Sequence, residues 1–260
     1  MNNKEPIKLY WWTHPKWSTN FGDILSPFIV QKLSGRSVVR STGSAKLVAC
    51  GSVMPHVRDR DIVWGTGIMF SHEPCDKKAQ FVAVRGPHTW KRVLCKNTEK
   101  CIYGDSAIVL PKILPVEHIG SKRYEIGVLP HYIDYERVKT LYQNVSDRIK
   151  VIDIMSGIEN VVRQMHSCWC LYTSSLHGII VAEAYGLNVN WVKWSEKIAG
   201  NDFKFHDYFA STQREGVSYI DGRNDTILSG KHRGLPKSYW TNDDSIKLMK
   251  SFPYLREDLK

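Results

Sequence analysis

The stretch SSLHGIIVAEAYG (174–186) places an ionisable imidazole at the junction between a strand-like run and an apolar run. The serines before it are typical helix N-caps and Gly186 is a typical helix stop, so we predict a helix from Leu176 to Tyr185. His177 then lies in the first helical turn, at the carboxyl end of a parallel strand. Anionic ligands bind at such ends, where an imidazole can hold or shuttle a proton; a histidine that only caps or packs is the alternative.

Other ionisable side chains stand at comparable places. Asp23, in NFGD, either accepts a proton or caps a helix, and Asp105, in YGDSA, follows a strand and is expected to be structural. His131, in LPHY, ends another strand and either lines the same cleft or satisfies a loop carbonyl. Lys204, in FKFHDYFAS, either reaches inward from a lid or belongs to an amphipathic helix, which is the commoner outcome for such spacing.

Aromatic side chains crowd the first strand and loop, YWWTHPKWSTN. Trp11 and Trp12 continue the strand, and strand residues of a parallel sheet are buried on both faces, so these two are expected in the core. His14 and Trp17 lie in a polar loop, which makes them better candidates for stacking on a ligand ring.

Strand-like and helix-like segments alternate along the chain, a pattern that predicts parallel sheets with right-handed crossovers. The proline-spaced segment LPKILPVEHIGSK interrupts the alternation and is the best candidate for a domain boundary. We therefore predict an α/β fold of two Rossmann-like domains, 1–117 and 118–260, whose parallel sheets face a cleft. The terminal helix is expected to kink at Pro253 and can pack back on the first domain. The expected elements are the strands 7–13, 45–53, 61–69, 81–86, 123–132, 149–156, 169–175, 188–194 and 217–222, and the helices 21–35, 87–95, 136–144, 158–167, 176–185 and 243–260.

The composition is that of a globular protein, with 42% hydrophobic residues among 260 and no apolar run of membrane-spanning length. The N-terminus lacks a signal peptide's apolar core, so a cytoplasmic protein is expected. A formal net charge of +10 favours anionic ligands or an anionic membrane surface, but no nucleic-acid-binding signature occurs and no nucleic acid is expected.

The six cysteines form no paired CxxC motifs, so neither a zinc site nor a disulfide framework is indicated, and reduced, mostly buried thiols are expected. GTG at 65–67 is not a dinucleotide fingerprint, so no cofactor is expected.

Taken together, several segments resemble the polysaccharide pyruvyltransferase family, in the family's order over about residues 10 to 220. The segments are TNFGDILSP (19–27), AVRGP (83–87), YGDSA (103–107), IGVLPHYID (126–134), TSSLHGIIVAEAYG (173–186) and FKFHDYFAS (203–211). The resemblance implies a fold similar to GT-B glycosyltransferases. It also implies transfer of the enolpyruvyl group of phosphoenolpyruvate to a sugar of a bacterial cell-surface glycan, typically lipid-linked at the inner membrane face, with a pyruvate ketal and phosphate as products.

The resemblance carries over residue by residue. The family's functional arginine and histidine match Arg85 and His177, and a family lysine beyond the histidine matches Lys197. Many members have an arginine where this chain has Ser175, so one anion contact is missing, and Lys193 or Lys204 can replace it.

Phosphoenolpyruvate, a substrate rather than a cofactor, carries two anionic groups that call for a guanidinium, an ammonium and backbone N–H donors. The expected donor-binding set is Arg85, Lys197, Ser174, Ser175, His131 and Lys204. The expected acceptor-binding set is His14, Trp17 and Asn20. His177, with Arg85 and Asp23 as further catalytic candidates, is expected to act as the acid that protonates the methylene carbon or as the base that deprotonates the sugar hydroxyl. The scheme requires no metal.

Two other functions remain open from the sequence. A GT-B glycosyltransferase that uses a nucleotide sugar would share the fold, since fold alone does not assign function. A non-catalytic basic module for acidic polysaccharide or nucleic acid would share the charge, and its affinity would fall steeply with salt.

Overall fold

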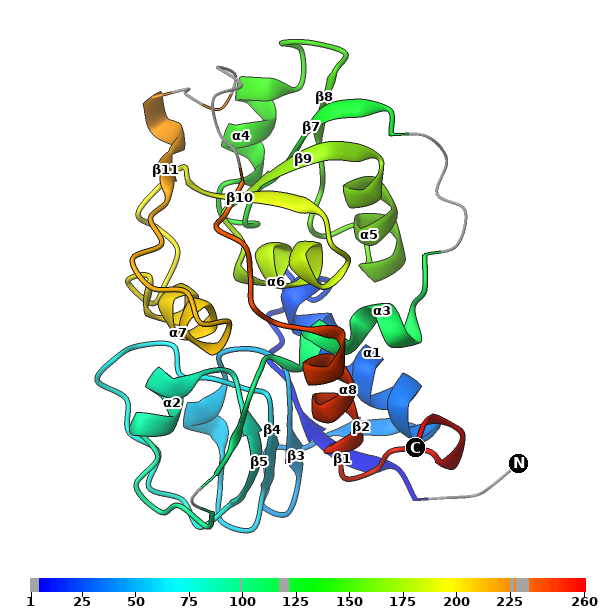
Figure 1. Cartoon of the computed structure of the whole chain (residues 1–260), viewed down its shortest axis with the longest axis vertical. Coiled ribbons are helices and arrows are strands. Elements are labelled where there is room, and N and C mark those ends of the chain that lie inside the picture. Colours follow the sequence, from blue (N-terminus) through cyan, green and yellow to red (C-terminus); the bar gives the residue numbers. More distant parts are fainter. Residues whose placement is uncertain (1–4, 99, 117–121, 225–226, 228–233) are drawn as a thin grey trace.

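The computed structural model describes residues 5–98, 100–116, 122–224, 227 and 234–260. It is an α/β structure with two parallel sheets, one in each of two lobes (Figure 1). The first sheet has the order β2 (Val38–Arg40), β1 (Ile7–Tyr10), β3 (Leu47–Val48), β4 (Ile62–Trp64), β5 (Gln80–Val84) and β6 (Ile102–Tyr103). The second has the order β11 (Ile220–Asp221), β10 (Asn188–Lys193), β9 (Cys168–Thr173), β7 (Tyr124–Leu129) and β8 (Ile149–Val151).

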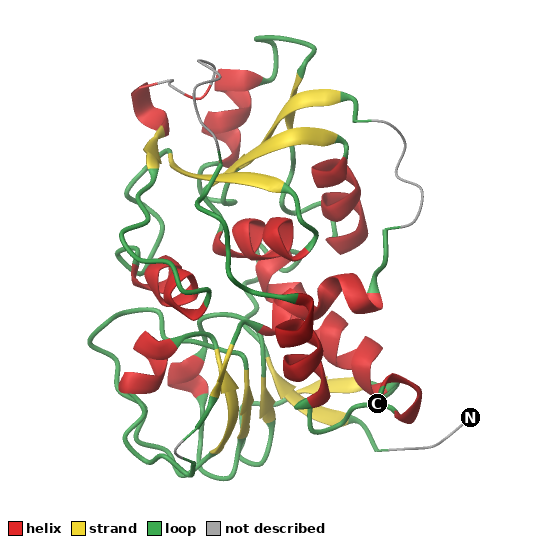
Figure 2. Cartoon of the chain, in the orientation of Figure 1, coloured by secondary structure: helices red, strands yellow, loops and turns green. Residues whose placement is uncertain are grey.

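Helices cover and connect the two sheets (Figure 2). The α-helices are α1 (Phe21–Ser34), α2 (Pro87–Lys91), α3 (Leu110–Ile113), α4 (Tyr135–Tyr142), α5 (Ile158–His166), α6 (Leu176–Ala184), α7 (Phe203–Ser211) and α8 (Asn242–Lys250). Short 3₁₀ turns are η1 (Met54–His56), η2 (Ser106–Val109), η3 (Gly222–Asn224) and η5 (Glu257–Leu259). The two-sheet α/β prediction is therefore confirmed. The predicted boundary after residue 117 falls in a segment outside the described residues.

The predicted strands are generally too long at their carboxyl ends. The first strand ends at Tyr10, three residues before its predicted end, and residues 11–20 form a loop. The predicted strand 45–53 is paired only over Leu47–Val48. Apolar residues beyond a strand's last ladder pair still pack into the core, so a run of apolar residues overstates the paired length.

The sequences of α1 and α6, the two helices nearest the interface between the lobes, explain where these helices end and which sides they bury. In α1, Leu25, Ile29 and Leu33 repeat every four residues and are fully buried, and Gly35 ends the helix at φ +64°. Helix α6 is apolar on nearly all sides, which predicts a helix enclosed by the protein. Its Ser175 N-cap accepts a hydrogen bond from the Gly178 N–H, as predicted.

A single buried apolar cluster extends through both lobes. It includes Leu9 and Trp64 from the first sheet, Ile29 of α1, Ile179 of α6 and Leu171 from the second sheet. The lobes are therefore joined by close packing rather than by a flexible connection alone.

Helix α8 returns from the second lobe to the first, as Figure 1 shows. The buried indole of Trp64 donates hydrogen bonds to the Leu248 carbonyl and the Ser251 hydroxyl, both at 3.1 Å. The helix ends at Lys250, before Pro253, so the predicted kink at Pro253 is wrong. The chain instead leaves the helix and makes a turn before the proline.

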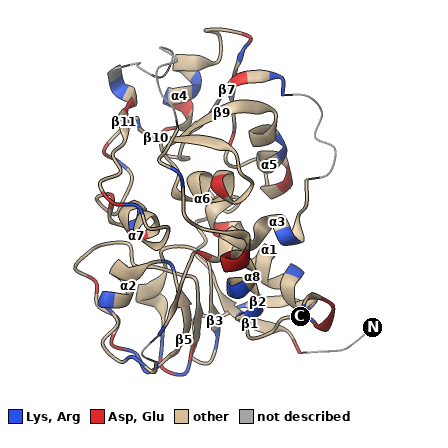
Figure 3. Cartoon of the chain, in the orientation of Figure 1, with Lys and Arg blue, Asp and Glu red and all other residues tan. Residues whose placement is uncertain are grey.

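Two surface properties bear on ligands and membranes. Lys and Arg are spread over both lobes and interspersed with Asp and Glu, so the net positive charge is not concentrated in one run (Figure 3). Within the part of the chain that the structure describes, no helix has both the length and the apolarity needed to cross a bilayer. All six cysteines are free thiols, and three of them are buried.

A buried ion pair lies at the amino-terminal edge of the first sheet. The candidate ligand-binding residues lie at the opposite edge, where the strands end. Lys46 precedes β3 and Asp61 precedes β4, their side chains are fully buried, and the Lys46 ammonium contacts the Asp61 carboxylate. The same carboxylate accepts the backbone N–H of Lys46 at 3.1 Å and of Arg58 at 2.7 Å.

We predict that Lys46→Met lowers the free energy of unfolding by about 3–5 kcal/mol, because it leaves a buried carboxylate without its counter-charge. Chemical denaturation measures the loss. Lys77→Met is the matched control, since Lys77 pairs with Asp76 on the surface and its removal is expected to leave stability unchanged. Equal, small effects of both substitutions would show that the Lys46 pair does not hold the sheet edge.

Candidate active site between the lobes

A cavity of about 340 Å³ lies where the carboxyl ends of the two sheets meet. It is lined by Trp12, Asn20, Gly22, Asp23, Gly51, Ser52, Val53, Pro55, His56, Met69, Phe70, Glu73, His131, Tyr132, Ser175, Leu176, His177 and Lys204. Both lobes contribute, and six of the residues predicted from the sequence are among the lining: Asn20, Asp23, His131, Ser175, His177 and Lys204.

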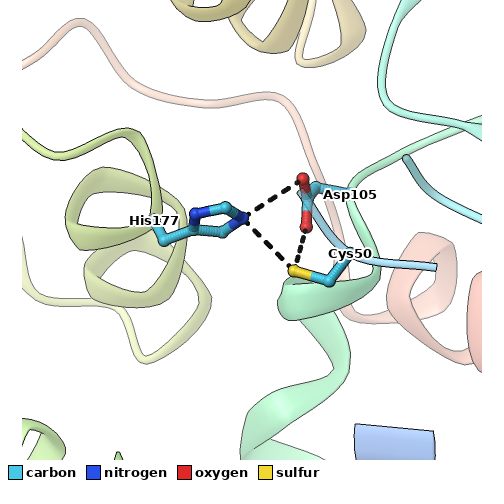
Figure 4. A group of neighbouring side chains, drawn as sticks. All are labelled: Cys50, Asp105 and His177. Carbon is cyan, nitrogen blue, oxygen red and sulfur yellow. Dashed lines mark hydrogen bonds and ion pairs between the residues drawn. The ribbon is translucent and has the colours of Figure 1, made fainter. Parts of the chain in front are cut away.

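His177 enters this cavity from the first turn of α6 and points toward the first lobe (Figure 4). Its Nε2 lies 3.2 Å from the Cys50 Sγ and 3.8 Å from the Asp105 Oδ2. Its Nδ1 faces α1, where a Cβ added to Gly22 would come within 2.5 Å of it. Only glycine at position 22 therefore lets the ring sit this close to the helix backbone.

Cys50 and Asp105 come from equivalent places in the first sheet. Each lies two residues beyond the end of its strand, Cys50 after β3 and Asp105 after β6. Asp105 caps η2, since its Oδ1 accepts a hydrogen bond from the Ala107 N–H at 2.9 Å. The other oxygen, Oδ2, is buried and accepts no hydrogen bond from any described residue, so it is available to the imidazole.

The surroundings of His177 favour its neutral form. Burial of the ring lowers its pKa, the Asp105 carboxylate acts in the opposite direction, and the positive charges of Arg85 and Lys204 lower it further. A neutral imidazole near a carboxylate can accept a proton, after which the carboxylate stabilises the imidazolium.

Asp23 shows the opposite shift. Burial raises the pKa of this carboxyl to about 6, although a hydrogen bond from the Asn20 amide at 2.8 Å and the charge of Lys204 both lower it. Asp23 neighbours Gly22 in the first turn of α1, beside the His177 ring. The cavity thus holds two titratable groups whose environments move their pKa values in opposite directions, an arrangement typical of acid and base pairs.

Lys204 is the buried cation of the cavity. It is only 8% exposed, at the start of α7, and its ammonium makes no hydrogen bond or ion pair with any described residue. Burial lowers its pKa to about 8, and the nearby Arg85 lowers it too, while Asp202 and Asp23 act in the other direction. A desolvated ammonium without a counter-ion is a ready site for an anion.

The amino end of α6 adds neutral donors to the same place. The backbone N–H groups of Leu176 and His177 reach no acceptor among the described residues. Such free N–H groups, aligned with the helix dipole, favour an anionic ligand.

Arg85 lies behind the cavity wall rather than in it. Its fully buried guanidinium donates to Asp207 at 3.0 Å, to the Ser52 hydroxyl at 2.6 Å and to the Ile68 carbonyl at 2.6 Å. Ser52 itself lines the cavity. Removing Arg85 would leave the buried Asp207 carboxylate without its counter-charge, so its loss would affect stability as well as ligand binding.

His131 lines the second-lobe side of the cavity. Burial and the positive field of Lys204 lower its pKa to about 3, so it remains neutral at physiological pH. Its backbone N–H donates to the Ser174 hydroxyl at 2.9 Å, which places Ser174 behind the lining as a structural partner.

Lys197 lies outside the cavity. It is exposed in the loop after β10, where its backbone N–H donates to the Ser195 hydroxyl. Lys193 is paired with Glu196 at 3.0 Å and Asp202 at 2.8 Å, so its charge is already compensated. The structure therefore brings Lys204, rather than either of these lysines, to the imidazole.

An aromatic row continues from the cavity to the surface. His14 stacks on Trp17 at 4.4 Å between ring centroids, Trp17 contacts Tyr132 at 4.6 Å, and Tyr132 contacts His131 at 4.2 Å. The predicted ligand residues His14 and Trp17 thus reach the cavity through Tyr132. Trp12, expected in the core, is 44% exposed and lines the cavity.

The sequence reasoning missed Cys50, Ser52 and Tyr132, and it took Asp105 for structural. The signal for Asp105 was its position just past a strand, because parallel strands of one sheet end at one edge. Cys50 falls inside the predicted strand 45–53, so only the early end of β3 in the structure reveals that it occupies an equivalent position. Their ligand atoms and the His177 nitrogen all lie within 4.8 Å of one another, close enough to hold one metal ion.

Two parallel-sheet lobes hold between them two titratable groups with opposed pKa shifts and an ammonium that no described residue pairs with, a framework suited to group transfer. The chain belongs to the polysaccharide pyruvyl transferase family, whose family model matches residues 4–196. This membership confirms the resemblance seen in the sequence and identifies the chain as a transferase with a polysaccharide acceptor. It is similar to the uncharacterized protein L143 of Acanthamoeba polyphaga mimivirus, with 30% identity over 201 residues, 74% of this chain and 70% of the relative. No solved structure matches significantly.

We predict that Lys204→Met raises the free energy of unfolding at pH 7, on the order of 1–3 kcal/mol, because it removes a charge whose burial is unfavourable. The folded-state pKa of Lys204, about 8, lies below the ordinary 10.5, so wild-type stability rises with pH between these values. The difference between variant and wild type should therefore shrink above pH 8. Thermal and chemical unfolding across pH 6–10 measure both effects.

The same variant should lose the increase in melting temperature that inorganic phosphate gives the wild-type protein. Lys197→Met, at an exposed lysine, is the matched control and should keep it. If phosphate still raises the melting temperature of Lys204→Met but no longer raises that of Lys197→Met, the anion site belongs to Lys197.

Proposed function

We propose that this protein transfers the enolpyruvyl group of phosphoenolpyruvate to a hexose of a lipid-linked cell-surface glycan, forming a pyruvate ketal and releasing phosphate. The observation that supports it most directly is the buried Lys204 ammonium, which makes no hydrogen bond or ion pair with a described residue, in the same cavity as His177 and Asp23. Membership in the polysaccharide pyruvyl transferase family supports a pyruvyl group as the group transferred and a glycan as the acceptor.

The donor requires compensation of two anionic groups. In this proposal the Lys204 ammonium and the free N–H groups at the start of α6 bind the phosphate and the carboxylate. Arg85 adds positive charge from behind Ser52, through which it is hydrogen-bonded to the cavity wall. Binding of the dianion compensates charges that otherwise repel one another in a desolvated site.

The opposed pKa shifts assign the proton transfers. Neutral His177, backed by the Asp105 carboxylate, takes the proton of the sugar hydroxyl as its oxygen attacks C2 of phosphoenolpyruvate. Protonated Asp23 gives its proton to the C3 methylene, which becomes a methyl group. The His177 imidazolium then protonates the departing phosphate, and a second hydroxyl of the same sugar adds to C2, gives its proton to the Asp23 carboxylate and closes the ketal.

The aromatic row supports the acceptor side. Trp12, Tyr132 and Asn20 line the cavity, and Asn20 donates a hydrogen bond to Asp23. Trp17 and His14 extend the aromatic surface outward from Tyr132. Sugar rings stack on aromatic faces of this kind. We further propose that the two lobes have the GT-B arrangement and that the positive surface assists approach to an anionic, cytoplasmic membrane face.

We predict that His177→Gln lowers the rate of phosphate release from phosphoenolpyruvate by about 10²–10⁴-fold, because the proton acceptor is lost. A panel of acceptor glycosides, with mass spectrometry of the products, provides the assay. His206→Gln, at an exposed histidine on α7, is the control and should retain full activity.

The assay also separates the rival functions. A nucleotide-sugar glycosyltransferase would bind a nucleoside diphosphate tightly and release no phosphate from phosphoenolpyruvate. A non-catalytic basic module would bind glycan or nucleic acid with steep salt dependence and unchanged affinity in His177→Gln. Either result would contradict the proposal.

We predict that wild-type kcat/KM falls as pH rises through about 6, because Asp23 must carry a proton in order to donate it. The residual activity of Asp23→Asn should lack this decline, since the titrating group is gone. Steady-state rates at constant ionic strength between pH 4.5 and 8 test this. A rate that instead rises through pH 6 in wild type but not in Asp23→Asn would make Asp23 the base and His177 the acid.

A further inference from the structure

A thiol that the proposed reaction does not use lies against the catalytic imidazole. The Cys50 Sγ is 3.2 Å from the His177 Nε2 and 3.5 Å from the Asp105 Oδ1, and the His177 Nε2 is 3.8 Å from the Asp105 Oδ2 (Figure 4). Cys50 and Asp105 are buried, and within the described part of the chain the Asp105 Oδ2 is a buried oxygen without a hydrogen bond. A thiol, an imidazole and a carboxylate thus lie close together, and the Asp105 Oδ2 lacks a hydrogen bond from the described residues.

The spacing of these atoms is that of a small tetrahedral metal site. Bond lengths typical of zinc, about 2.3 Å to sulfur and 2.0–2.2 Å to nitrogen and oxygen, place tetrahedral ligand atoms about 3.4–3.6 Å apart. The separations from the His177 Nε2 to the Cys50 Sγ, 3.2 Å, and to the Asp105 Oδ2, 3.8 Å, deviate from this by only a few tenths of an ångström, and all three ligand atoms lie within 4.8 Å of one another. The Ala107 N–H already holds the other carboxylate oxygen, so Asp105 is oriented for coordination through Oδ2.

The chemistry of the ligands selects the ion. A thiolate, an imidazole and a carboxylate together favour Zn²⁺ and related late transition ions over Mg²⁺ or Ca²⁺, which prefer oxygen ligands only. Three protein ligands leave a fourth position open. His177 lines the cavity, so this position can face the ligand space.

We propose that Cys50, Asp105 and His177 bind one zinc-class divalent ion at the floor of the cavity. Cys50 and Asp105 belong to the first lobe and His177 to the second, so the ion links the two lobes. Binding releases the thiol proton to solvent and occupies the Nε2 lone pair. The coordinated ring carries its remaining proton on Nδ1 and has no lone pair to accept another. The ion therefore inhibits, a consequence that rests on the proposed role of His177 as the base.

Binding is tested on the metal-free full chain with Zn²⁺ and Co²⁺ as probes. We expect one equivalent to bind, a sulfur-to-cobalt charge-transfer band, and a higher melting temperature with metal because the ion joins the lobes. Cys50→Ser should lose the band and bind at least tenfold more weakly, whereas Cys95→Ser, at a partly exposed thiol, should behave like wild type. Absence of the band in wild type, or equal binding by both variants, would overturn the site. If Cys50→Ser fails to fold, Asp105→Asn serves in its place and should likewise bind more weakly.

Activity separates the site from the proposed function. Zn²⁺ should slow phosphate release by wild type and by Cys95→Ser, a chelator should restore it, and any activity of Cys50→Ser should be insensitive to Zn²⁺. Binding at Cys50 without inhibition would leave the metal site intact and overturn the assignment of His177 as the base. Inhibition that persists in Cys50→Ser would place the inhibitory ion elsewhere and overturn the link between this site and the reaction.

Discussion

The close packing of α6 against the first lobe is the constraint on which the site depends. The helix is apolar on nearly every side, and its burial carries the His177 ring to the carboxyl edge of the other sheet. Gly22 leaves just enough room for the ring, and Asp105 and Cys50 meet its far nitrogen. A hydrophobic contact between the lobes thus fixes the position of the imidazole that we propose transfers a proton, since a helix packed this tightly cannot rotate or slide without opening cavities.

The same burial determines the electrostatics. Removing water moves the pKa of Asp23 up and that of Lys204 down, and both shifts have desolvation as their largest cause. Among the described residues, none forms an ion pair or hydrogen bond with the Lys204 ammonium, so the protein keeps an unfavourable charge that the proposed anionic substrate would neutralise. Stability and binding are opposed at this position, as is common where activity requires a desolvated group.

Much of this architecture was accessible from the sequence. Alternating strand and helix patterns predicted two parallel sheets, and the Ser and Gly signals around α6 located its ends. Periodicity could not predict how the lobes meet, because that depends on which surfaces pack together. For this reason the sequence favoured Lys197 over Lys204, which the structure reverses, and Cys50, 127 residues from His177 along the chain, gave no metal-ligand spacing. Terminal helix length was also misjudged, since the apolar residues after Lys250 pack without continuing the helix.

The return of α8 to the first lobe has a consequence for motion. The polypeptide crosses between the lobes after the first sheet and again before α8, and the Trp64 indole anchors that second crossing. Two connecting segments between the same two lobes resist the wide hinge rotation that a single linker permits. Substrates should therefore enter through rearrangement of the loops at the cavity rim, such as residues 11–20, while the lobes keep a nearly fixed separation.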